Sequence, residues 1–447
     1  MNGMKGSRKH AKTPRNTPDP SSLCVPASLR ETETLTPKLR FPEFGDQTWR
    51  EVLLQDVTAE CTTRNGENLP IDSIMGVTKA DGIVPMEERL IGVDISRYKV
   101  IQKDCFAYNP MRLNIGSIAR WKNDSDALVS PDYVVFRCLN EESHALEPAF
   151  LDHFRRSDQW RDFVSESGLG SVRVRIYYKD IGRLRLSLPS RPEQQKIAQC
   201  LSTLDELIGA ESQKLDALKA HKKGIMQQLF PREGETLPRL RFPEFRRAGK
   251  WEKKRVDELG DVLAGKALAV NAPGTLRPYL RTKNVLDGVI DLSDVLSMPM
   301  TDAEFSRFEI LDGDILLNEG QSLELVGRAS IYRGEFKGRC AMQNQLLRFR
   351  AFPETSREFA AQVFRKCQRD GTFADISTKT TSIAHLGSSR FSALELAWPS
   401  PAEQHRIATC LSSLDELIAA QSDRLSALQT HKQGLLQQLF PSPELSC

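Results

Sequence analysis

A glycine-containing stretch near the middle of the 447-residue chain has the residue types that hold nucleotide phosphates in other proteins. Gly260 to Lys266 reads GDVLAGK and matches the GxxxxGK part of the phosphate-loop pattern. In that pattern a Ser or Thr hydroxyl follows the lysine and binds magnesium. Here Ala267 follows, and no clear apolar strand precedes the glycine. We therefore expect no nucleotide site in this stretch.

The other motifs that could support catalysis are also incomplete. FAYNPM (106–111) partly resembles the Asn-Pro-Pro-aromatic motif of adenine methyltransferases, but Met111 replaces the second proline and the aromatic residue is absent. The seven histidines have no HExxH spacing, and the nine cysteines contain no CxxC pair. The sequence therefore predicts no catalytic residue, no metal site and no cofactor bound by this chain.

Composition limits the class of protein without identifying it. The net charge is only +3, hydrophobic residues make up 40% and charged residues 27%, as is typical of soluble globular proteins. No apolar run approaches the roughly 20 residues that span a bilayer, and the basic N-terminus is followed by no signal-type apolar segment. We therefore expect a cytoplasmic protein with reduced thiols that is not bound to a membrane. A small net charge still permits local basic surfaces that contact phosphates.

The most informative feature is an internal repeat. Residues 193–231 and 403–441 align at a constant offset of 210, and 25 of the 39 positions are identical. The hexapeptide LRFPEF also occurs twice, at 39–44 and 240–245, and a tryptophan follows each copy at Trp49 and Trp251. The stretches between these markers hardly match. The chain therefore contains two copies of a whole domain followed by a helix, and the two domains have diverged.

Each repeated segment has the spacing of a long amphipathic helix, about 57 Å for about 38 residues. Its apolar residues alternate at four and three positions, with Glu211, Lys222, Gln421 and Lys432 at the interrupted steps. We predict that the two helices pair antiparallel as a coiled coil, with these polar residues setting the register. The alternative is that each helix packs only on its own domain. The expected helix-pairing residues are Ile197, Leu201, Leu204, Ile208, Leu215, Leu218, Ile407, Leu411, Leu414, Ile418, Leu425 and Leu428.

The variable stretches have the patterns of mixed α+β domains. Alternation and β-branched residues predict strands over 100–110 and 127–138, and helical spacing covers 144–164. Residues 171–189 open with strict alternation, which places Arg173 and Arg175 on one face of a strand. The predicted organisation is a disordered extension (1–36), a first domain (37–190), helix 1 (191–231), a second domain (232–400), helix 2 (401–441) and a short tail (442–447).

This combination resembles the specificity subunits of type I restriction-modification systems. The resemblance rests on the duplicated domains, on Pro192-Glu193-Gln194 at the start of helix 1, on the QQLFP ending of both helices, and on DGDILLNEG (312–320). It covers roughly residues 37–441, although Ala402 interrupts the second Pro-Glu-Gln. The resemblance implies two target-recognition domains that each read half of a split sequence in double-stranded DNA. It also implies two methyltransferase subunits and motor-nuclease subunits as partners, which would carry S-adenosylmethionine, ATP and magnesium.

Candidate DNA contacts follow from this interpretation and from the surface cations of each domain. Arg173 and Arg175 are the strongest, although single candidates of this kind are more often solvated surface residues than DNA contacts. The full set is Arg112, Asn114, Arg173, Arg175 and Lys179 in the first domain, and Arg328, Lys379 and Arg390 in the second. Two alternatives stay open: a specificity subunit that serves one fused methyltransferase-nuclease partner, and a coiled-coil scaffold whose degenerate domains no longer bind DNA.

Overall fold

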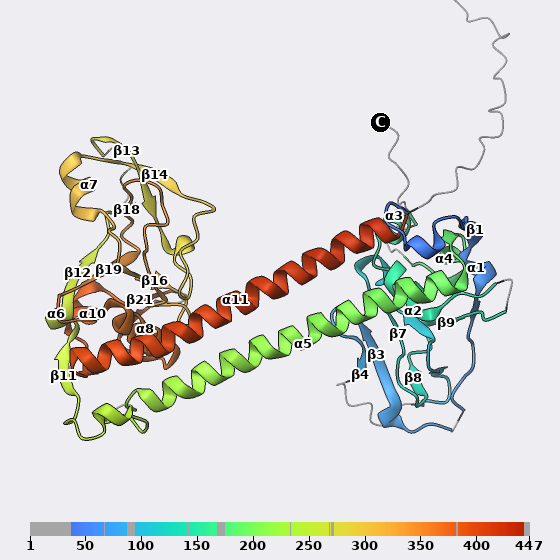
Figure 1. The fold of residues 1–447 in the computed structure, drawn as a ribbon, viewed down its shortest axis with the longest axis horizontal. Helices are drawn as coiled ribbons and strands as arrows, with labels where there is room; N and C mark the ends of the chain where they lie inside the picture. The colour runs from blue at the N-terminus through green and yellow to red at the C-terminus, as the bar shows by residue number, and fades with distance from the viewer. Residues whose placement is uncertain are drawn as a thin grey trace, which may run out of the picture. The chain divides into compact units, whose positions relative to one another are not determined.

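The computed structural model describes residues 37–66, 68–86, 94–141, 144–167, 175–232, 234–267, 269, 272–380 and 383–441. The extension 1–36 and the tail 442–447, for which we predicted disorder and a short tail, lie outside these residues. The chain divides into a first unit, Met1–Asp205 with Thr430–Cys447, and a second unit, Glu206–Gln429. Each unit holds a mixed domain and the adjoining parts of two long helices (Figure 1). The predicted α+β architecture with two long helices is confirmed.

The first unit contains three sheets, with strand orders β1-β10, β2-β9-β6-β7 and β4-β3-β8-β5. Its strands are β1 Arg50–Leu53, β2 Thr58–Glu60, β3 Ile74–Thr78, β4 Gly82–Pro85, β5 Lys99–Ile101, β6 Phe106–Tyr108, β7 Ile118–Arg120, β8 Ala127–Val129, β9 Val134–Cys138 and β10 Arg185–Leu188. Its short helices are η1 Pro42–Phe44, α1 Leu54–Val57, η2 Ile71–Ser73, η3 Leu113–Ile115, α2 Pro148–Phe154, α3 Asp158–Glu166 and α4 Tyr178–Ile181. The long helix α5 Arg191–Leu229 begins here.

The second unit has sheets with strand orders β11-β22, β12-β19-β15-β17, β14-β13-β18 and β16-β21-β20. Its strands are β11 Glu252–Arg255, β12 Gly260–Ala264, β13 Thr275–Leu280, β14 Leu296–Met300, β15 Ile315–Asn318, β16 Gly320–Gln321, β17 Ala329–Ile331, β18 Ala341–Met342, β19 Leu346–Ala351, β20 Thr378–Lys379, β21 Ala384–His385 and β22 Glu395–Trp398. Its helices are η4 Pro243–Phe245, α6 Val256–Leu259, η5 Thr282–Asn284, α7 Asp302–Phe308, α8 Arg357–Arg369, α9 Thr372–Ile376, α10 Ser388–Ala393 and the long α11 Pro401–Leu439.

The two domains share the strand order of their main sheets although their sequences have diverged. The order β2-β9-β6-β7 corresponds to β12-β19-β15-β17, and β1-β10 corresponds to β11-β22. The parallel pair of β3 with β8 also has its counterpart in the parallel pair of β13 with β18. Two weakly similar segments, DCFAYN (104–109) and DILLN (314–318), therefore contain equivalent central strands, β6 and β15.

Three expected elements of the first domain are each split in two. The predicted strand over 100–110 is β5 and β6, because the chain turns at Asp104, which has a positive φ of 66°. Residues 127–138 form β8 and β9, separated by a turn in which the Tyr133 amide donates to the Ser130 carbonyl oxygen at 3.0 Å. The helical stretch 144–164 is α2 and α3, with Ser157 capping α3. The predicted type of secondary structure, strand or helix, is correct for all three segments. The turns inside them were not predicted, because such turns hardly change the hydrophobic pattern.

The core of the first unit contains both ends of the helix repeat. Ile197 and Leu201 of α5 and Leu439 of α11 belong to one buried cluster with residues of the domain. Phe440, from the QQLFP ending of the second copy, stands edge-on to Phe150 with ring centroids 5.3 Å apart. The predicted pairing residues at the start of α5 are therefore also core residues of the domain.

The second unit repeats this packing with the copies exchanged. Ile407 and Leu411 of α11 are buried in its core together with Leu229 of α5. Phe230, from the first QQLFP, lies 5.6 Å from the Phe359 ring, measured between ring centroids. Each ending thus inserts its phenylalanine into the domain that belongs to the other copy, which explains why both copies keep this motif.

The two long helices run antiparallel and are joined by the polar residues that interrupt their seams. Within the second unit, Gln421 Nε2 donates to Glu211 Oε2 at 2.5 Å and to the Glu211 carbonyl oxygen at 3.0 Å. Lys222, further along α5, reaches Asp415, nearer the start of α11, at 2.5 Å. Residue numbers rise along one helix as they fall along the other, so the direction is antiparallel. Of the remaining expected pairing residues, Leu215 is buried, and Leu204, Ile208, Leu218, Leu414, Ile418, Leu425 and Leu428 are half-buried.

Candidate nucleic-acid interface

The repeated LRFPEF and Pro-Glu-Gln segments form a clamp that fixes each domain to the start of its helix. Arg40 donates from Nε and Nη2 to the two carboxylate oxygens of Glu193, at 2.7 and 2.8 Å. Arg241 binds Glu403 in the same bidentate way, at 2.7 and 2.6 Å. Both carboxylates are almost fully buried. The sequence identifies the Pro-Glu-Gln context of Glu193, but nothing in it indicates the arginine partners of these glutamates.

The glutamine of each clamp connects the same helix to the adjoining helix of the domain. Gln194 Oε1 accepts the Glu147 amide at 2.8 Å, next to the start of α2, and its Nε2 donates to the Pro189 carbonyl oxygen at 3.0 Å. In the second copy, Gln404 Oε1 accepts the Ser356 amide at 2.9 Å. The side chains of the repeated motif are thus used to position the domain, and they are not available for chemistry.

A second repeated contact joins each domain to both long helices. In the second unit, Asp415 of α11 accepts hydrogen bonds from Lys222 at 2.5 Å, from Gln362 at 2.8 Å and from Arg365 at 3.2 Å. Lys222 comes from α5, whereas Gln362 and Arg365 lie on α8 of the domain. One carboxylate therefore connects three elements; we call this group the Asp415 node.

The first unit contains the equivalent Asp205 node. Asp205 of α5 pairs with Lys432 of α11 and accepts from Arg156, next to α2, at 3.2 Å. His153 of α2 lies beside it and takes the place of Gln362, with its Nε2 2.9 Å from Ser202 Oγ. Burial, followed by the nearby Arg156 charge, lowers the pKa of His153 to about 4.

This histidine predicts a pH dependence for the first unit. The folded pKa of about 4 lies below the unfolded value of 6.5, so the unfolded chain binds the proton more readily. The stabilising contribution is complete above pH 6.5 and is lost as the pH falls from 6.5 towards 4. It amounts to at most about 3–4 kcal/mol. Urea unfolding of His153→Gln, which copies Gln362, should lack this component; an unchanged pH profile would show that His153 is not responsible.

The structure brings three of the predicted DNA contacts of the first domain onto neighbouring segments. Arg112 is exposed at the N-cap of η3, and Asn114 is exposed within η3. Arg175 is also exposed and lies close to this segment, because the amide of the next residue, Ile176, donates to the Pro110 carbonyl oxygen at 3.0 Å. Lys179 is exposed on α4. Arg173 lies outside the described residues, and residues 175–177 form no strand. The alternating face proposed for Arg173 and Arg175 is therefore not seen in the described part of the chain.

In the second domain the predicted contacts differ in their surroundings. Lys379 is exposed on β20. Arg390 on α10 is exposed but donates to the His385 carbonyl oxygen at 2.8 Å. Arg328 is half-buried, and its Nε donates to the Val285 carbonyl oxygen at 3.0 Å, so this side chain has a packing role.

Exposed apolar side chains on the same two segments were missed from the sequence. Met111 and Ile115 are 50% and 54% exposed beside Arg112 and Asn114, and Tyr177 is 42% exposed. The corresponding segments of the second domain expose Leu323, Leu325 and Ile383. These segments are joined in the same way, since the Leu386 amide donates to the Glu319 carbonyl oxygen at 2.9 Å. Apolar side chains can contact thymine methyl groups or wedge between bases, but periodicity rules assign them to a core.

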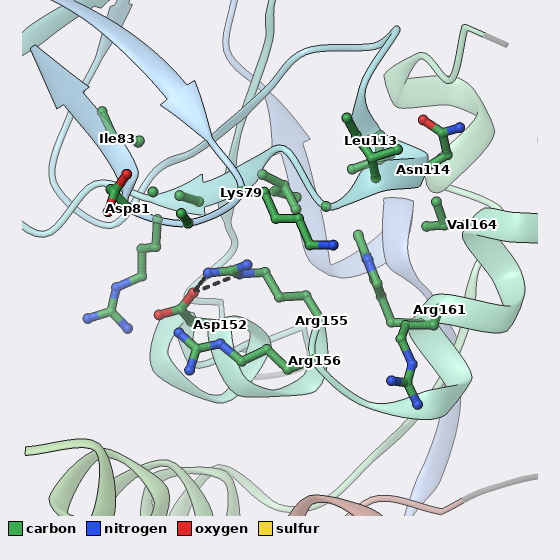
Figure 2. A pocket seen from close by; sticks show the side chains of 18 of the residues that line it. Lys79, Asp81, Ile83, Leu113, Asn114, Asp152, Arg155, Arg156, Arg161 and Val164 are labelled. Atoms are coloured by element: carbon green, nitrogen blue, oxygen red, sulfur yellow. Dashed lines mark hydrogen bonds and ion pairs between the residues drawn. The ribbon is translucent and has the colours of Figure 1, made fainter. Parts of the chain in front are cut away.

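A basic cavity of about 780 Å³ opens beside η3 in the first domain. Its walls are the turn between β3 and β4, η3, β7 with the residues that follow it, and helices α2 and α3. Figure 2 shows Lys79 reaching from the turn towards the helices that carry Arg155 and Arg161. The cationic lining residues are Lys79, Arg120, Lys122, Arg155, Arg156 and Arg161, against the carboxylates of Asp81 and Asp152. Arg120, Arg156 and Arg161 also pair with carboxylates outside this lining, but the converging Arg and Lys donors still suit a phosphate.

The possible catalytic motifs gain no support from the described residues. Gly260–Ala264 form strand β12, paired with β19, and so these residues are not a phosphate-binding loop. A search of the described residues finds no cluster of three His, Cys, Asp or Glu side chains that could hold a metal ion. Among the described residues, no helix is sufficiently long and apolar to cross a bilayer.

Duplicated mixed domains, each attached to a pair of antiparallel helices, define the architecture of a subunit that presents two similar but separately diverged surfaces. The sequence matches the type I restriction modification DNA specificity domain over residues 115–220 and 248–430. The chain belongs to this family.

Individual relatives agree with this assignment. The chain is 21% identical over 244 residues to the EcoKI specificity subunit of Escherichia coli K12, covering 54% of this chain and 49% of the relative. It is 25% identical over 168 residues to a putative MjaX specificity subunit of Methanocaldococcus jannaschii, covering 36% of each. These alignments span between a third and a half of the relatives' lengths. The solved S subunit from M. genitalium matches the fold with a TM-score of 0.55 at 14% identity, covering 91% of this chain and 100% of that one.

Proposed function

We propose that this chain is the non-catalytic subunit that selects the DNA target of a type I restriction-modification enzyme. Each domain would read one half of a bipartite sequence, and the paired helices would set the separation of the halves and dock the methyltransferase and motor-nuclease subunits. The complex would act in the cytoplasm. The observation that carries the proposal is the shared strand order of the main sheets in two domains whose surface segments, 110–116 and 319–326, differ in sequence.

The contacts within each unit support this division of labour. The clamps and the two nodes use the repeated residues, and so the attachment of both domains is held constant while the exposed loops vary. Arg112, Asn114 and Arg175 would contact DNA in the first domain, and Lys379 and Arg390 in the second, with phosphate contacts supplying affinity and base edges supplying specificity. S-adenosylmethionine, ATP and magnesium would be bound by the partner subunits.

Exchange of one domain is the decisive test. Replacing residues 50–190 with the equivalent domain of a relative should change one half of the methylated sequence and leave the other half unchanged. The reciprocal exchange of residues 252–398 is the matched control and should change only the opposite half. Genome-wide methylation mapping in a host that carries the chimaera reads the result directly. A change in both halves, or in neither, would contradict modular reading.

A further inference from the structure

The two domains differ clearly in one hairpin, which β3 and β4 form in the first domain and β13 and β14 form in the second. In the first domain, β3 turns into β4 through residues 79–81 alone. In the second domain, β13 and β14 are joined by the much longer segment 281–295. The same place in the fold therefore carries a tight turn in one copy and a substantial loop in the other.

The long loop of the second domain packs against strand β17 and helix α8. The Gly288 amide donates to the Ala329 carbonyl oxygen at 3.1 Å. A Cβ at Gly288 would lie 3.1 Å from the guanidinium carbon of Arg365, so the loop lies directly on this side chain. The Asp287 carboxylate accepts from Arg365 Nε at 2.7 Å and from Arg369 Nη2 at 2.8 Å. This loop therefore supplies a carboxylate to a pair of arginines.

The equivalent walls in the first domain enclose the basic cavity. Strand β7 corresponds to β17, and the α2–α3 region corresponds to α8. Arg156 matches Arg365, because each binds the aspartate of its node, Asp205 or Asp415, at 3.2 Å. Arg365 also binds Asp287, whereas Arg156 lines the cavity beside Arg155 (Figure 2). Lys122 lines the same cavity. The short turn 79–81 brings Lys79 to this space together with Asp81, whose carboxylate forms no ion pair with Arg155 or Arg156 among the described residues.

We propose that the cavity of the first domain binds a phosphate group in the position that Asp287 fills in the second domain. Six cations line a space of about 780 Å³. Arg155 and Lys122 share Asp152, at 2.7 and 3.7 Å, whereas Lys79 has no carboxylate partner among the described residues. The other three cations each bind one carboxylate outside the lining, namely Asp104 for Arg120, Asp205 for Arg156 and Asp158 for Arg161. A phosphate offers several strong acceptors to converging Arg and Lys donors. The group comes either from the backbone of bound DNA, in which case this inference rests on the proposed function, or from a small phosphate compound.

The test titrates the full-length protein with inorganic pyrophosphate and, separately, with duplex DNA that carries the methylated target sequence. The variant K79A/K122A removes two exposed cations of the cavity, and K253A/K337A removes the same charge from exposed positions of the second unit. We expect one pyrophosphate per chain, bound at least about tenfold more weakly by K79A/K122A and normally by K253A/K337A. The variant D287A should raise the stoichiometry to two, because Arg365 and Arg369 lose their internal carboxylate.

The DNA arm separates the two sources. A backbone phosphate in the cavity predicts that K79A/K122A reduces the slope of log affinity against log salt by about 1, with pyrophosphate competing against DNA. A small phosphate compound predicts lost pyrophosphate binding with DNA affinity unchanged. The proposal is overturned if K79A/K122A alters neither titration. Pyrophosphate binding without any selective DNA binding by the wild type would refute the proposed function and leave the cavity assignment standing.

Discussion

Replacing Glu193 with alanine should lower the free energy of unfolding of the first unit by about 3–5 kcal/mol, because it leaves a largely buried arginine without its counter-ion. The Arg40 side chain is only 14% exposed, and the carboxylate that it binds is fully buried. Trp49 Nε1 also donates to Glu193 Oε2 at 3.1 Å, so the substitution removes the acceptor of a second buried donor. Two desolvated groups would lose their partner at once.

The second copy supplies a matched comparison. Arg241 binds Glu403 with the same geometry, but Trp251 Nε1 has no hydrogen-bond acceptor among the described residues. Glu403→Ala should therefore destabilise the second unit less than Glu193→Ala destabilises the first, by roughly the value of one hydrogen bond to a charged group, about 1.5–3 kcal/mol. Urea unfolding followed by tryptophan fluorescence resolves both. A loss below about 1 kcal/mol for Glu193→Ala would show that the clamp is not a main attachment.

Local periodicity predicted the helix scaffold well, since it depends on residues close together in sequence. The alternating apolar positions gave two helices of nearly the observed length. The interruptions at Glu211, Lys222, Gln421 and Lys432 correctly marked residues that bond across the pair. The sequence alone leaves open whether the helices pair with each other or pack on their own domains. The structure shows both, because Ile197 and Leu201 at one end of α5 join a domain core while Glu211 and Lys222 bond to α11.

The remaining features depend on contacts between residues that are distant in sequence. Nothing near Phe440 indicates that it packs on Phe150, and nothing near Glu193 indicates Arg40, 153 residues away. Apolar residues such as Met111 were assigned no surface role, because a pattern cannot distinguish a buried methionine from an exposed one. The DNA contacts that were proposed from the sequence remain a prediction. Three of them in the first domain, Arg112, Asn114 and Arg175, do lie on adjoining segments.

Asp415→Ala is expected to lower the free energy of unfolding of the second unit by about 3–5 kcal/mol, as Glu193→Ala does in the first unit. A second substitution, at Lys222, can show whether a buried unpaired charge is the cause. The Lys222 side chain is 5% exposed, and burial followed by the Arg365 charge already lowers its pKa. Without Asp415, this ammonium would remain buried near Arg365 and Arg369 with no counter-ion. Removing the charge as well, in Asp415→Ala/Lys222→Met, should recover much of the loss because an apolar side chain tolerates the site.

The double-mutant cycle separates the node from simple packing. If the ion pair is the cause, the effects of the two single substitutions are strongly non-additive. The coupling free energy should be about 1–3 kcal/mol, which lies within the usual range for residues in contact. Asp205→Ala in the first unit is the internal control. Its lysine partner, Lys432, is 11% exposed and therefore less dependent on the carboxylate, so a smaller loss is expected. Additive effects at Asp415 and Lys222 would mean that helix packing alone holds the second domain, and that the aspartates repeated in both copies serve another purpose.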